Sequence, residues 1–62
     1  MTIGEIINQI RIEQNLTWDW LEAETGVRRT TMHQWVLGRR NPLTKIEKVL
    51  NALGYELEVV KK

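Results

Sequence analysis

The stretch that decides the fold is residues 16–42, which read LTWDWLEAETGVRRTTMHQWVLGRRNP. Thr17 is a good N-cap for a short helix, because its hydroxyl can accept a hydrogen bond from a backbone N–H of the first turn. Gly26 ends that helix, since glycine readily adopts the left-handed conformation that follows a helix. Gly38 ends a second helix in the same way. The stretch therefore predicts two short helices joined by a glycine turn, at about residues 17–24 and 28–37.

Two further amphipathic segments flank this pair of helices. Before it, isoleucines at positions 3, 6, 7 and 10 follow the spacing of one helix face, and Thr2 with Glu5 can form a capping box at the start. After it, apolar residues again recur at helical spacing, at Ile46, Val49, Leu50 and Leu53. The sequence thus predicts two more helices, at about 2–14 and 43–53. We expect a mainly α, compact four-helix domain that covers residues 1–62.

Residues 55–60, YELEVV, follow a different pattern. Tyr55, Leu57 and Val59 alternate with Glu56 and Glu58, which predicts a short C-terminal β-strand. A lone strand would leave its backbone N–H and C=O groups unpaired, whereas a two-fold dimer supplies a second, antiparallel strand. We therefore expect a homodimer held by these three side chains. The competing expectation is a tail that folds back or is disordered, with dimerisation through Leu37 and the last helix.

Composition excludes several classes of function. The chain has 62 residues, no cysteine and a single histidine, so disulfides and structural zinc sites are not expected. No apolar run approaches the ~20 residues that span a membrane, and the N-terminus lacks a signal-peptide pattern, so we expect a cytoplasmic protein. Glu22 and Glu24 do not share a helix face, and no nucleophile and base form an evident pair. We expect neither an enzyme nor a cofactor, metal or small-molecule ligand.

Charge is distributed unevenly along the chain. The net charge is +1, but residues 1–27 carry five acidic groups and one basic group, whereas residues 28–48 carry six basic groups and one acidic group. A basic segment of this kind favours a surface that binds a polyanion. The alternative interpretation is a set of solvated surface side chains.

The two central helices and their glycine turn form a helix-turn-helix pattern. Residues 16–42, together with ALGYELEVV at 52–60, resemble the helix-turn-helix family of phage repressors, Cro and XRE-type bacterial regulators. The resemblance covers residues 3 to about 54. The matching residues are Leu16, Thr17, Leu21, Gly26, Val27, Thr31, Met32, Trp35, Gly38, Asn41, Pro42, Ala52, Leu53 and Gly54. It implies a lambda-repressor-like domain, and some antitoxin-type members of this family add a C-terminal strand.

The resemblance also implies roles for particular side chains. The third helix of the family lies in the DNA major groove, which assigns base readout to Arg28, Arg29, Thr30, His33 and Gln34. It assigns phosphate contact to Trp18, Thr31, Arg39 and Arg40. The chemistry agrees, since arginine pairs with guanine and glutamine with adenine through two hydrogen bonds each. Two cations at a positive helix start also favour an anionic or base partner. His33 could equally be a bystander.

Several positions depart from the family pattern. Trp18 stands where glutamine is common, Glu22 where a small alanine is usual, and Arg28 where a serine or threonine caps the helix. Arg11 lacks its usual acidic partner, because that position is Val36. We expect Arg11 to reach solvent, Glu13 or the C-terminal carboxylate.

Two functions follow as expectations. The first is a dimeric transcriptional repressor, phage Cro-like or an autoregulating antitoxin, that binds an inverted repeat in double-stranded DNA. The alternative is a protein-binding module for a toxin or host protein. Its apolar contact residues would be Trp18, Trp20, Val36 and Leu37, which can otherwise be core variation.

Overall fold

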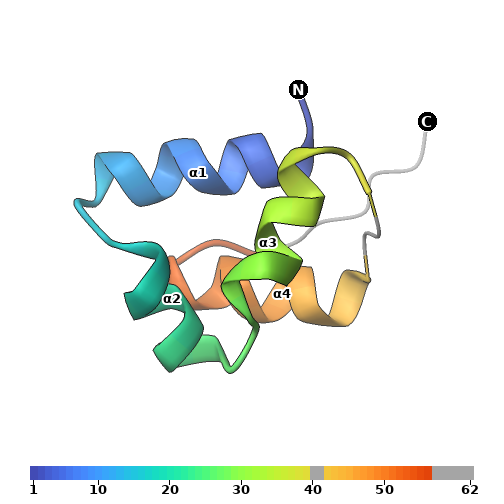
Figure 1. Cartoon of the computed structure of the whole chain (residues 1–62). Helices are drawn as coiled ribbons and strands as arrows, with labels where there is room; N and C mark the ends of the chain where they lie inside the picture. Colours follow the sequence, from blue (N-terminus) through green and yellow to red (C-terminus); the bar gives the residue numbers. More distant parts are fainter. Residues whose placement is uncertain (40–41, 57–62) are drawn as a thin grey trace.

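A computed structural model describes residues 1–39 and 42–56 and shows four helices in these ranges (Figure 1). They are α1 (Ile3–Glu13), α2 (Trp18–Thr25), α3 (Arg29–Val36) and α4 (Leu43–Ala52). Each boundary lies within one residue of the boundary expected from the sequence, and the mainly α class is confirmed. The strand expected at 55–60 lies mostly outside the described residues, and the two that are described, Tyr55 and Glu56, lie in no helix or strand.

Side-chain caps begin the first two helices as the sequence predicts. The Thr2 hydroxyl accepts from the Glu5 N–H at 3.1 Å, and Glu5 Oε1 accepts from the Thr2 N–H at 3.1 Å, which completes the capping box. The hydrogen bond that the Thr2 backbone N–H donates to this carboxylate, and secondly the nearby Thr2 hydroxyl, lower the pKa of the Glu5 carboxyl. Thr17 caps α2 by accepting from the Trp20 N–H at 3.0 Å.

Left-handed backbone conformations end α1 and α2. Asn15 has a φ of 58°, and Gly26 at the end of α2 has a φ of 75°. Asparagine and glycine are the residues that adopt this conformation at least cost. The turn between α2 and α3 therefore depends on a glycine. The next residue, Val27, is buried in the core.

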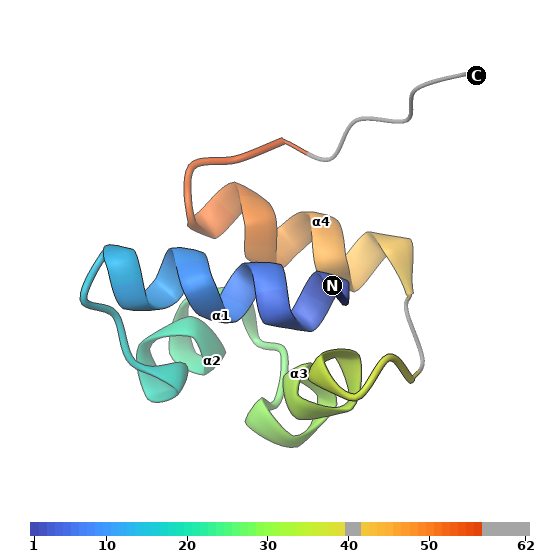
Figure 2. The ribbon, with the colours of Figure 1, turned by 90° about the horizontal axis from the view of Figure 1, so that it is seen from above.

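The main contacts join helices that are two apart in the sequence. α1 packs mainly on α3, and α2 packs on α4 and on α3. In Figure 1, α1 lies above the other three helices; seen from above in Figure 2, α4 appears on one side of α1 and the pair α2 and α3 on the other. The ends of α1 and α4 are also joined, since Gln14 Nε2 donates to the Leu53 carbonyl at 2.8 Å. None of the described helices is both long and apolar enough to cross a membrane.

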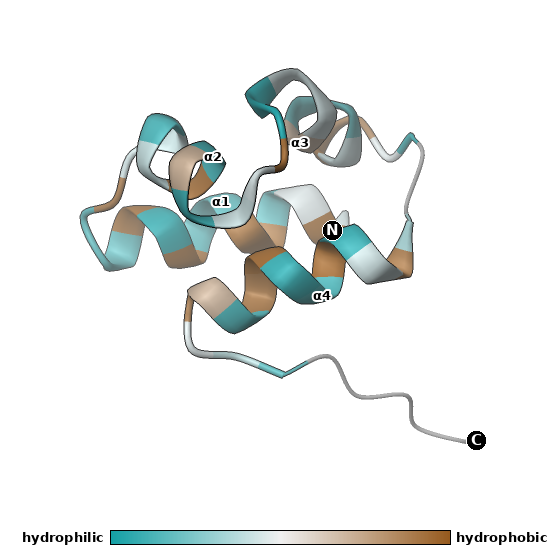
Figure 3. Ribbon diagram, turned by 90° about the horizontal axis from the view of Figure 1, so that it is seen from below, coloured by the Kyte–Doolittle hydropathy of each residue, from teal (hydrophilic) through white to brown (hydrophobic). Residues whose placement is uncertain are grey.

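One core joins all four helices, and the apolar stretches of α1 and α4 stand out in Figure 3. Its buried side chains are Ile7, Ile10, Leu21, Val27, Met32, Trp35, Ile46, Val49, Leu50 and Leu53. The isoleucine stripe of α1 is only partly correct as a prediction, because Ile6 is 37% exposed. The buried Gly4 rests against α3, which turns the buried face of α1 toward Ile7 and leaves Ile6 at its edge.

Candidate nucleic-acid interface

The start of α3 is capped from a neighbouring helix. Arg28, the residue at the N-cap position, makes no side-chain cap hydrogen bond. Instead, the carboxylate of Glu22 in α2 accepts from the Arg29 N–H at 2.6 Å. A carboxylate at a helix N-terminus also offsets the positive end of the helix dipole. Glu22 thus supplies the cap that the Arg28 side chain does not make.

A second contact joins α2 to α3 across the glycine turn. Arg29 Nη1 lies 3.0 Å from Asp19 Oδ1, with the two side chains 52% and 76% exposed. An exposed pair of this kind adds little stability on its own. It places the guanidinium of Arg29 beside α2, at the solvent-facing start of α3.

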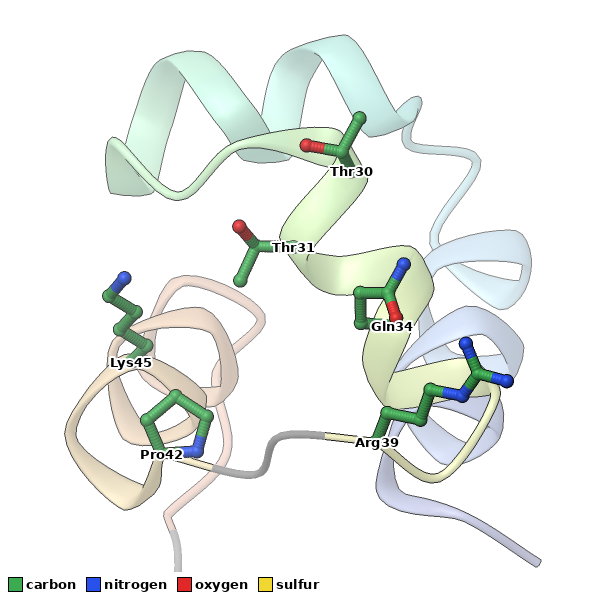
Figure 4. A pocket seen from close by; sticks show the side chains of 6 residues that line it. All are labelled: Thr30, Thr31, Gln34, Arg39, Pro42 and Lys45. Carbon is green, nitrogen blue, oxygen red and sulfur yellow. The ribbon is translucent and has the colours of Figure 1, made fainter.

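A polar groove of about 590 Å³ lies between α3 and the beginning of α4. Figure 4 shows Thr30, Thr31 and Gln34 of α3 on one side of the groove and Pro42 and Lys45 on the other, with Arg39 from the intervening loop. The described residues that line it contribute two cations, hydroxyls and an amide, and no carboxylate. The groove thus offers hydrogen-bond donors and positive charge to an anionic ligand.

Four residues expected from the sequence to bind DNA therefore lie together. They are Thr30, Thr31, Gln34 and Arg39. Lys45 belongs to the same groove but was not among the expected site residues. The signal for it was present in the sequence, since Lys45 belongs to the basic segment 28–48 and to the first turn of the last helix.

Trp18 and His33 lie elsewhere, in a second hollow of about 480 Å³. Their rings meet edge to face, with centroids 5.1 Å apart and planes at 86°. The hollow is also lined by Asn8, Arg11, Val36 and Leu37. Neither ring lines the polar groove, so the two residues expected at the DNA surface belong to a separate surface beside it.

Arg11 has partners that the sequence did not suggest. Its Nη1 donates to the Leu16 carbonyl at 2.8 Å, and its Nε and Nη2 donate to Asn8 Oδ1 at 3.2 and 2.7 Å. The guanidinium also lies 4.7 Å from the centre of the Trp18 ring, a cation–π distance. Among the described residues Arg11 forms no ion pair with Glu13, and the C-terminal carboxylate lies outside them; the half-buried Arg11 side chain is instead held by an amide, a carbonyl and a ring face.

Some of the remaining expected residues lie in the described part of the chain, and the others lie outside it. Arg28 is exposed but lines neither hollow, and Leu37 is 64% exposed at the edge of the second. Trp20 is exposed and does not line the second hollow. Tyr55 is exposed at the end of the described chain. Arg40, Leu57 and Val59 lie outside the described residues.

Comparisons of the chain with protein-family models, with curated proteins and with solved structures find no match. The function therefore has to be inferred from the residues and their arrangement. Two surfaces are available for that inference. One is the polar groove with the adjoining start of α3, and the other is the hollow that Trp18 and His33 share.

Proposed function

We propose that this chain is a sequence-specific regulator of transcription that binds double-stranded DNA, with α2 and α3 as a helix-turn-helix and α3 in the major groove. The observation that carries the proposal is the convergence of Thr30, Thr31, Gln34, Arg39 and Lys45 on one groove. Phosphate oxygens and base edges are the ligands that this mixture of cations, hydroxyls and an amide fits.

The α4 side of the groove suits the DNA backbone. Lys45 lies in the first turn of α4, and the N-cap residue Pro42 makes no side-chain cap hydrogen bond. The first N–H groups of the helix and the positive end of its dipole therefore favour an anion. With Arg39 and the Thr31 hydroxyl across the groove, this surface supports contact with phosphates, which fixes the position of α3 on the duplex.

The exposed side of α3 suits the base edges. Gln34 can donate to adenine N7 and accept from adenine N6, and Arg29 can donate twice to guanine. Thr30 is exposed next to Arg29 and can contact a thymine methyl. Arg28 is exposed at the start of the helix and joins the proposed set of readers, whereas His33 is exposed but lies against Trp18 in the second hollow.

We propose further that the regulator is a dimeric repressor. Residues 55–60 would pair with a second copy as an antiparallel ribbon, whose side chains Tyr55, Leu57 and Val59 would cover α1 and α4. Two copies then place their α3 helices about one DNA turn, ~34 Å, apart, as an inverted-repeat operator requires. Deletion of residues 56–62 should produce a monomer with weak, non-cooperative binding. A truncated chain that sediments as a dimer at micromolar concentration would instead favour an interface through Leu37 and α4.

The test of the proposed function is a selection of bound duplexes from a random pool, followed by a salt titration. We expect an enriched inverted repeat. We also expect affinity for random DNA to fall with salt at a slope of about −0.9 per phosphate contacted. A chain that enriches no sequence and binds no duplex at low salt would overturn the proposal.

A second candidate function is a protein-binding module for a toxin or a host protein. The observation in its favour is that Trp18, Val36 and the exposed Leu37 line one hollow outside the polar groove. Leu37→Ser should weaken such a complex, whereas Lys45→Ala on the polar groove should not. The reverse order of effects, measured with duplex DNA, supports the regulator.

A further inference from the structure

The start of α3 and the start of α4 differ in one respect that bears on how DNA would be read. At α3, Glu22 already accepts from the first helical N–H, that of Arg29, and Asp19 lies against the Arg29 guanidinium. At α4, the first turn has no acidic residue and no side-chain cap. Both helix ends belong to the proposed DNA surface, yet only the second is open to a phosphate.

The charge of Arg29 is locally balanced. With Asp19 Oδ1 3.0 Å from Arg29 Nη1, a phosphate that approaches this side chain meets a nearly neutral pair. The Glu22 carboxylate adds a further negative charge at the helix end where a phosphate would otherwise bind. Arg29 therefore contributes little to the electrostatic attraction to phosphates, which does not depend on the DNA sequence.

The hydrogen-bonding capacity of Arg29 is nevertheless preserved. A guanidinium carries five N–H donors in a rigid plane, and the ion pair engages only Nη1. Among the described residues, no contact involves its Nε or Nη2. That edge has the two parallel donors that guanine O6 and N7 require. Because one end of the plane is held by Asp19, less conformational freedom is lost when the other edge binds a base.

We infer that Asp19 is a specificity-determining, positioning residue that makes Arg29 a reader of guanine and prevents it from acting as a general phosphate anchor. This inference rests on the proposed DNA-binding function. Sequence-independent affinity then comes mainly from the groove with Arg39 and Lys45, and discrimination comes from the start of α3. The two tasks are divided between the start of α3, where Asp19 and Glu22 balance the positive charge, and the start of α4, whose first turn has no acidic residue.

The test compares Asp19→Asn with a matched control, Glu24→Gln. Both changes remove one negative charge from α2, but Glu24 is exposed and makes no contact with Arg29 among the described interactions. Each variant is measured on the selected operator, on the operator changed at the guanine that Arg29→Ala identifies, and on random duplex. Thermal unfolding of each variant is recorded in parallel.

We expect Asp19→Asn to lower discrimination at that guanine by roughly three- to tenfold, a fraction of what a full bidentate contact supplies. Its binding to random duplex should tighten, and its salt slope should steepen by about 0.9, because Arg29 becomes free to bind one more phosphate. Glu24→Gln should change all three duplexes by one common factor. In the Arg29→Ala background, Asp19→Asn should not change discrimination at this position.

Equal discrimination by Asp19→Asn and Glu24→Gln would overturn the inference while leaving the DNA-binding function intact. The same holds if Arg29→Ala relaxes no single position of the operator. A wild-type chain that selects no sequence from the pool overturns both, so the two failures are distinguishable.

Discussion

Gly4 of α1 lies directly against the backbone of Val36 at the end of α3. A Cβ atom placed on Gly4 would lie 2.1 Å from the Val36 nitrogen and 2.3 Å from the carbonyl carbon of Trp35. Neither atom belongs to a flexible side chain that could move aside. The two helices therefore approach so closely that only a hydrogen atom fits at this position.

The substitution Gly4→Ala should consequently destabilise the fold. Overpacking costs about 1–3 kcal/mol. Contact with backbone places this case at the upper end, even though alanine is the better helix former by about 0.5–1 kcal/mol. Urea unfolding followed by circular dichroism measures the loss. Gln9→Ala, at an exposed position of the same helix, is the control and should be nearly neutral. A Gly4→Ala chain as stable as wild type would contradict the close approach.

Glu22 should contribute to stability as the cap of α3. Replacement by alanine leaves the Arg29 N–H without its partner and should cost about 1 kcal/mol, a typical value for the loss of a cap. In a domain of this size that loss lowers the melting temperature by roughly 4–8 °C. Glu22→Gln retains an acceptor oxygen and should lose less. Equal melting temperatures for wild type and both variants would show that the contact adds nothing.

Gln34 and Lys45 should differ in how they affect DNA binding. Gln34→Ala should weaken binding to the preferred operator by about 1–3 kcal/mol and relax one base position. Lys45→Ala should weaken all duplexes alike and lower the salt slope by about one. Titrations on operator and random DNA at several salt concentrations separate these effects. If both variants weakened both duplexes identically, the assignment of α3 to the major groove would be wrong.

The capping box of α1 should make stability depend on pH. The pKa of Glu5 is lowered in the folded state, so the carboxylate contributes stability that is fully present above its ordinary pKa of about 4.3. That contribution is lost as the pH falls through the lowered pKa. Glu5→Gln keeps the acceptor but does not titrate. Its unfolding free energy should decline less steeply than that of wild type between about pH 5 and about pH 3, and an unchanged slope would refute the role of Glu5.

Local signals in the sequence were sufficient for the helices. Thr2, Thr17 and Gly26 each act through a hydrogen bond or a backbone conformation within a few residues, and the structure confirms all three. Gly4 carried no such signal. Its role depends on the place where α1 crosses α3, which periodicity within α1 does not reveal.

The candidate site was predictable only in part, for the same reason. The resemblance to helix-turn-helix regulators implied a DNA-facing role for Thr30, Thr31 and Gln34, and the groove contains all three. Other contacts form because long side chains extend to a neighbouring segment. They are those of Arg29 with Asp19 and Glu22, and of Arg11 with Asn8 and Leu16. Such contacts depend on the rotamers and on the angle between helices, neither of which a linear pattern specifies.

The pairing of the helices has a consequence for how the chain folds. α1 packs mainly on α3, and α2 packs on α4. The first half of the chain contains α1 and α2, and the second half contains their packing partners. Neither residues 1–26 nor residues 27–56 can form a core alone, so partly folded forms gain little burial before their partners arrive. We therefore expect folding to be a single cooperative transition, and two fragments cleaved at Gly26 should remain unstructured apart and regain helix only when mixed.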